Sequence, residues 1–254
     1  MTSVVVSVLA FVCIFGGAVL GMRLRDILPE HHLSSDSKDV IKVAMAMIGT
    51  LAALVLGLLV STAKNTFDSK EADVVEGAAR LVLLDRTLAA YGTETKEARD
   101  MLRQIAVVRL KQIWPESSDD VIVSAQIGKG TGIEPVQRKI LDLSPQTDAQ
   151  HWAKSAALQI TGDIAAARWL IFEQTSSLLQ WPFLVILIFW LVVIFGSFGL
   201  FAPRNASVIA ALFVAALSLA GSIYLVLELD QPYDGLIKVS ADPLLMALGR
   251  LGGP

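Results

Sequence analysis

Hydrophobic and polar positions divide this chain into four long apolar runs separated by polar segments. The runs contain no Asp, Glu, Lys or Arg, and they are 19, 21, 20 and 22 residues long: Val4–Met22, Val43–Ala63, Phe183–Ala202 and Ala206–Leu227. A helix of roughly 20 residues crosses the hydrocarbon core of a bilayer. A helix in a soluble core would carry polar residues along one face, and these runs do not. The pattern predicts an all-α integral membrane protein with four transmembrane helices in the lipid bilayer.

The predicted spans form two pairs joined by short links. Residues 23–42 link the first pair, and Pro203, Arg204 and Asn205 link the second, with Asn205 placed to cap the last span. Short links require antiparallel hairpins. The predicted organisation is a first hairpin over residues 1–63, an extramembrane region over 64–182, a second hairpin over 183–227 and a C-terminal tail over 228–254. Because each hairpin returns the chain to its starting side, the N-terminus, residues 64–182 and the C-terminus are expected on one side of the membrane.

The region between the hairpins is predicted to be helical. Apolar positions recur at helical spacing from Glu71 to Tyr91 and again from Met101 to Ile113; in the first segment they are Val74, Val75, Ala78, Leu81, Val82 and Leu88. Gly92 is placed to end the first of these helices. A short helix is predicted near Pro135–Leu143, and a long one from about Thr147 to Leu179 with a kink at Trp181–Pro182. No sizeable independent core is expected here, because the helices are interpreted as extensions of the second and third spans.

The composition excludes some classes of function but does not indicate one. The net charge is −3, which does not suggest a nucleic-acid partner, and a mean hydropathy of +0.60 agrees with a membrane protein. Cys13 is the only cysteine, so no disulfide can form within the chain. No spacing of nucleophile, base or metal ligands typical of an enzyme is present, and no cofactor is expected.

Small side chains recur along one face of the second span. Thr50, Gly57, Ser61, Lys64 and Asp68 fall within roughly 40° of a common direction on a helix, and Gly49, Ala53, Gly57 and Ser61 recur every four residues. One explanation is a close helix–helix contact, for which small residues four apart are the usual signature. The other is a narrow pore lined by Thr50, Ala53, Gly57 and Ser61, with Lys64 at its mouth. Both hold if the packing face and the pore face adjoin in an oligomer.

A group of carboxylates follows the fourth span. Glu228, Asp230 and Asp234 lie within seven residues and could bind a cation at the membrane surface. Their spacing differs from that of an EF-hand loop, which favours the alternative that they cap the exit of the helix.

The distribution of basic residues gives opposing indications of orientation. Arg23, Arg25, Lys38 and Lys42 in the first link place the links in the cytoplasm by the positive-inside rule. Lys64, Lys70 and Arg80 follow the second span and indicate the opposite orientation.

Several segments resemble the bacterial bestrophin-like domain family: residues 25–33, 53–59 with Ala63 and Lys64, 84–92, 201–206 and 227–236. The resemblance covers nearly the whole chain. It implies kinship with bestrophins, which are pentameric channels chiefly for anions, and an order of hairpin, cytoplasmic helical region, hairpin and tail. It therefore implies a homo-oligomer, pentameric by analogy, in the plasma membrane, with residues 64–182 and both termini in the cytoplasm.

Three functions remain as hypotheses. The first is an oligomeric channel for inorganic ions, built around the second span, in which a ring of Lys64 side chains favours anions while Asp68 weakens that preference. The second is a non-conducting scaffold or sensor whose helical region binds a partner protein. The third, an ion-driven motor or transporter, is ranked last because such machines usually carry an ionisable group within the bilayer.

Overall fold

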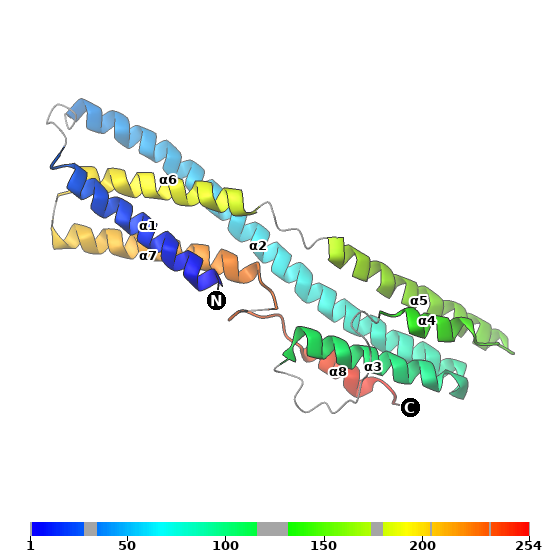
Figure 1. Ribbon diagram of the computed structural model, residues 1–254. Coiled ribbons are helices and arrows are strands. Elements are labelled where there is room, and N and C mark those ends of the chain that lie inside the picture. Colours follow the sequence, from blue (N-terminus) through cyan, green and yellow to red (C-terminus); the bar gives the residue numbers. More distant parts are fainter. Residues whose placement is uncertain are drawn as a thin grey trace. The chain divides into compact units, whose positions relative to one another are not determined.

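The computed structural model describes residues 2–27, 35–115, 132–173, 180–203, 205–233 and 235–253. The structure is 86% helical with no strands in these ranges, so the all-α prediction is confirmed. The elements, shown in Figure 1, are α1 (Thr2–Leu24), α2 (Ser35–Tyr91), the 3-10 helix η2 (Thr93–Thr95), α3 (Lys96–Ile113), α4 (Glu134–Leu141), α5 (Asp148–Glu173), α6 (Gln180–Phe201), α7 (Ala206–Leu229) and α8 (Asp242–Arg250). They divide between two compact units, and α2 contributes to both.

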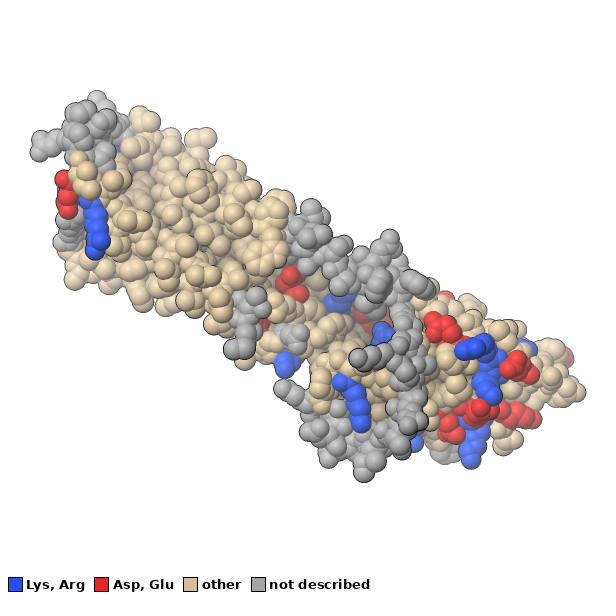
Figure 2. Space-filling model, viewed as in Figure 1, with Lys and Arg blue, Asp and Glu red and all other residues tan. Residues whose placement is uncertain are grey.

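The first unit, Met1–Phe67 with Ser177–Ile237, is the membrane unit. Its helices α1, α6 and α7, together with the first part of α2, are long and apolar enough to cross a bilayer, as the sequence predicts. At most a third of each apolar window is buried within the chain. Figure 2 shows a visible face with charged side chains only towards the ends of this unit. Such a surface is stable only against lipid or another apolar partner.

Helix α1 packs along both α6 and α7 (Figure 1). Its backbone meets α6 so closely that a side chain on Gly21 would collide with the Gly196 carbonyl, and one on Gly199 would collide with the Ala18 carbonyl. A Cβ atom on Gly17 would lie 2.9 Å from the Val192 carbonyl oxygen. Gly17 and Gly21, four apart in α1, permit this approach because they have no side chain at the contact.

The two links of the membrane unit meet at the same end. The Arg25 guanidinium donates a hydrogen bond of 2.9 Å to the Ala202 carbonyl, which ties the end of α1 to the end of α6. The Asn205 side chain accepts a hydrogen bond of 2.8 Å from the Val208 amide and caps α7, as predicted. Pro182 lies in the first turn of α6, where a missing amide costs little. Residues 174–179, over which the helix preceding this proline was expected to continue, lie outside the described ranges.

Helix α2 continues without interruption from the second span into the helical region, over 57 residues. At 1.5 Å per residue it is about 85 Å long, far more than the roughly 30 Å of a bilayer core. It ends where the sequence predicts, because Gly92 has φ of 137°, a conformation that few other residues adopt.

The second unit, Asp68–Ser176 with Lys238–Pro254, is the helical unit. It has its own core, in contrast to the expectation that the region lacks one; fully buried members include Leu84, Leu88, Leu102, Leu110, Val136 and Ile140. Residues 238–254, which belong to the segment predicted as a C-terminal tail, contribute Leu244, Ala247 and Leu251 to the buried residues of this unit. The Trp114 indole donates a hydrogen bond of 2.9 Å to the Val239 carbonyl, and α8 packs against α3. The helical periodicity marks each helix but does not reveal which distant segment covers it.

Candidate pore face

The proposed pore residues form a connected exposed face of α2 within the membrane unit. All of them are exposed: Thr50, Ala53, Gly57, Ser61 and Lys64. Positions three and four apart lie on the same side of a helix. The Thr50 hydroxyl donates a hydrogen bond of 3.0 Å to the Ala46 carbonyl of its own helix. The threonine therefore satisfies its donor within the helix and still presents an oxygen on this surface.

The opposite face of α2 joins the core of the membrane unit. Ala52, Leu59 and Ala63 belong to one buried cluster with Leu187 and Leu191 of α6. A Cβ atom added to Gly57 would meet no other atom within 4 Å among the described residues. The small side chains of the exposed face therefore do not serve the close packing of α2 inside its own chain, and that explanation now requires a second copy.

The charged end of the face begins at Lys64. Its ammonium group lies 5.8 Å from the centre of the Phe67 ring, within the range of a cation–π interaction. Lys64 is exposed, and so is Asp68 one turn further along α2. Charges of both signs thus follow the small side chains, which would give any opening at this end a mixed electrostatic character.

The carboxylates after α7 have separate environments. Glu228 is buried, and its side chain accepts a short hydrogen bond from the Leu236 amide across a turn in which Gly235 has φ of 114°. Asp230 is partly buried, and this burial raises the pKa of its carboxyl group. Asp234 lies outside the described residues. No group of three acidic, His or Cys side chains that could hold a metal occurs in the described ranges, so cation binding by these carboxylates stays a prediction.

The sequence profile of the bestrophin-like domain matches residues 8–244, nearly the whole chain. The chain belongs to the bestrophin-like domain family. Neither the comparison with curated proteins nor the comparison with solved structures found a match. Membership in the family suggests a channel-like membrane function, in agreement with the four apolar helices.

The structure of this bestrophin-like protein also exposes large apolar side chains outside the candidate pore face. In the helical unit, Val75 and Leu83 of α2 are 50% and 55% exposed. Between them, Ala79 is exposed as well, and these residues are four apart. Periodicity marked Val75 as one apolar position among several, and only the packing of α2 shows that it lies on the uncovered side. The helix therefore has an exposed small or apolar face in each unit.

Proposed function

We propose that this bestrophin-like protein assembles into a homo-oligomer, pentameric by family analogy, that conducts inorganic ions passively through the plasma membrane. The α2 helices surround the axis, and Thr50, Ala53, Gly57 and Ser61 line the pathway. Lys64 lies at the cytoplasmic mouth and favours anions, with Asp68 reducing the preference. The helical unit and both termini are in the cytoplasm.

The observation that supports this proposal is a series of small, mildly polar residues on the exposed part of α2, opposite its buried side. Small, mildly polar side chains gain no more free energy from contact with lipid acyl chains than leucine side chains would. Around an axis it brings helices close together and still presents hydroxyl groups to water. Thr50 and Ser61 supply those hydroxyl groups at two levels of the membrane.

Cysteine accessibility tests the pathway directly, because Cys13 is the only native cysteine and Cys13→Ser gives a clean background. In that background we expect Thr50→Cys, Gly57→Cys and Ser61→Cys to react with a charged thiosulfonate and to lose current in reconstituted vesicles. Leu58→Cys is the matched control, since Leu58 is 62% exposed on another side of the same helix. Equal reaction at all four positions, or currents absent from the unmodified protein at every voltage, would refute the pore.

Exposed apolar residues in the helical unit favour a second candidate, a membrane-anchored scaffold that binds a partner protein through this unit. Val75, Leu83 and Trp152 are at least half exposed, and all three lie in the helical unit. Gly57→Leu separates the two functions, because a pore loses its ion flux while a scaffold loses at most its assembly. Both quantities can be measured on the same preparation, by flux from vesicles and by light scattering.

A further inference from the structure

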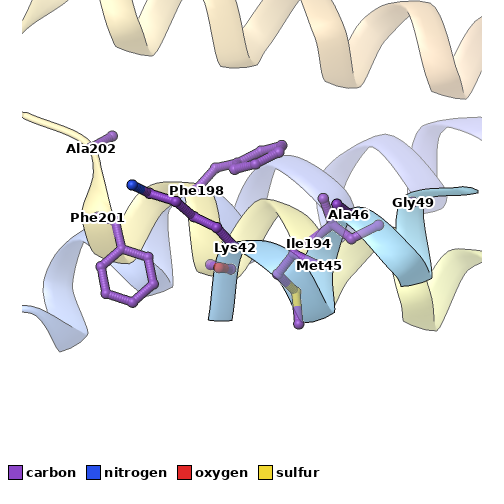
Figure 3. A pocket seen from close by; sticks show the side chains of 9 residues that line it. Lys42, Met45, Ala46, Gly49, Ile194, Phe198, Phe201 and Ala202 are labelled. Carbon is purple, nitrogen blue, oxygen red and sulfur yellow. The ribbon is translucent and has the colours of Figure 1, made fainter. Parts of the chain in front are cut away.

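A pocket of about 570 Å³ lies between α2 and α6 in the membrane unit, at the end where the two links meet. Figure 3 labels several of its lining residues, among them Lys42, Ala46, Gly49, Phe198 and Ala202. Its volume falls in the range of sites that hold a small organic molecule. None of the five proposed pore residues lines it, although Gly49, the first member of the small series on α2, does.

The lining is almost wholly apolar. Only Lys42 and Ser197 bring polar side-chain atoms, and all but one of the lining residues lie within the helical segments suited to cross a membrane. Water bound here would find few hydrogen-bond partners and is a poor occupant. Phe198 is 49% exposed, and Lys42 and Ala46 on the α2 side of the pocket are exposed as well. The pocket therefore opens on a surface that is covered by lipid in the membrane.

One basic side chain, Lys42, lines the pocket, and a second, Arg25, contacts a lining residue. The Lys42 side chain extends along the pocket towards Ala202 (Figure 3), whose carbonyl accepts the hydrogen bond from Arg25. Lys42 also contacts Asp39 at 3.2 Å, with side chains 67% and 74% exposed. An exposed ion pair of this kind contributes little, so the ammonium group can exchange it for a phosphate at small cost. An apolar slot beneath paired basic groups complements a molecule with an acyl chain and an anionic head.

We propose that this pocket binds one acyl chain of an anionic phospholipid from the surrounding leaflet, with the lipid phosphate paired with Lys42 and Arg25. The bound acyl chain contacts the apolar walls of α2 and α6 in place of neighbouring acyl chains. The two basic side chains favour a lipid with an anionic headgroup. This site is independent of the proposed pore, because it needs only α2 and α6 of a single chain.

To test the proposal, the full chain is reconstituted in vesicles of equal phosphatidylglycerol and phosphatidylcholine and then extracted with detergent. The lipid that the protein retains is identified and quantified by mass spectrometry. The wild-type protein should retain phosphatidylglycerol preferentially. Lys42→Glu should lower the ratio of the two retained lipids roughly thirtyfold, since a basic residue near a membrane surface contributes about 1 kcal/mol and its reversal about twice that. Lys38→Glu, on the same helix but outside the pocket, is the charge control. An equal effect of both variants would overturn the proposal in favour of general surface attraction.

Filling the pocket gives the second measurement. A Cβ atom at Gly49 meets no described atom within 4 Å, so Gly49→Leu can occupy the pocket without forcing the helices apart. We expect this variant to lose the retained lipid, while Gly221→Leu, at an equally open position on α7, keeps it. Ala46→Leu provides a second filling variant if Gly49→Leu fails to fold. Undiminished lipid in both filling variants would overturn the proposal. The proposal would also be overturned if the filling variants changed the oligomer size in light scattering but still retained the lipid. That result would indicate that a helix of a second copy occupies the pocket.

Discussion

Removal of the Arg99 guanidinium tests whether the C-terminal segment is anchored through a buried ion pair. Asp85 of α2 is completely buried, and its two carboxylate oxygens accept hydrogen bonds of 2.8 and 3.0 Å from Arg99 of α3. Arg99 also donates a bond of 2.7 Å to the Gly253 carbonyl, and the Gly252 amide lies 3.3 Å from an Asp85 oxygen. One charge pair therefore joins two helices to the last residues described.

Arg99→Ala leaves the Asp85 carboxylate buried without its cation. Removing one partner of a buried pair typically costs about 3–5 kcal/mol, and we expect about 3 kcal/mol because the Arg99 side chain retains 18% exposure. A loss of this size lowers the Tm of a domain by roughly 6–12 °C. The hydrogen bond with Asp85 raises the pKa of Arg99, so the guanidinium stays charged at every practical pH and only substitution removes it.

Thermal unfolding of the full chain in detergent, followed by circular dichroism, measures this loss. Arg80→Ala is the matched control, since Arg80 pairs with Glu76 at 2.6 Å on the surface and its removal should cost less than about 1 kcal/mol. Cleavage of a C-terminal tag by added protease should accelerate in Arg99→Ala and not in Arg80→Ala. Equal melting and equal cleavage of the two variants would show that the buried pair does not hold the segment.

Three further predictions follow from other parts of the structure. Gly199→Leu should destabilise the membrane unit by about 3 kcal/mol in thermal unfolding, because its side chain meets the α1 backbone, whereas Gly221→Leu should melt like the wild type. Burial raises the pKa of Asp230 in the folded state above its ordinary value of 3.8. The stability that comes from the protonated carboxyl group is therefore fully present below pH 3.8 and is lost as the pH rises through the folded-state pKa. Asp230→Asn should thus melt higher than the wild type at pH 7 and identically at pH 3, and equal melting at both pH values would contradict this. Leu83→Ser should shift the protein towards smaller oligomers in light scattering without lowering its Tm, since this side chain is 55% exposed in the single chain.

The membrane spans could be predicted from sequence because hydrocarbon imposes one simple demand: an uninterrupted apolar helix of sufficient length. Val43–Ala63 and its three counterparts meet that demand without reference to the rest of the chain. The start of α7 and the end of α2 could be predicted for a similar reason, since the Asn205 cap and the Gly92 stop depend on local backbone chemistry. Both kinds of signal act within a few residues.

The core of the helical unit could not be predicted in the same way. Asp85 reads as a surface carboxylate on an amphipathic helix, and its burial becomes intelligible only when Arg99 and the C-terminal segment are beside it. Trp114 likewise finds its acceptor at Val239, more than a hundred residues away in sequence. Such contacts satisfy polar groups that periodicity assigns to solvent.

The candidate pore face could be predicted only in part from the sequence. The helical spacing of Thr50, Gly57 and Ser61 defines a common face from sequence alone, but not what that face contacts. The structure assigns the close backbone packing to the glycines of α1 and α6 and leaves the small residues of α2 exposed. The pocket beside Lys42 could not be predicted, because its lining comes from α2 and α6, which are distant in sequence.

The two halves of α2 would contribute differently to an assembly. Within lipid, an exposed Leu58 gains no hydrophobic free energy by pairing with another helix, since acyl chains are equally apolar. Val75 and Leu83 lie in the helical unit, where half of each side chain remains exposed, and burying apolar area against water contributes about 25 cal/mol per Å². The driving force for association would therefore come from the helical unit, and the small residues of the membrane half would set how closely the helices approach. This division lets a pore remain narrow and hydrated without requiring the residues that line it to hold the oligomer together.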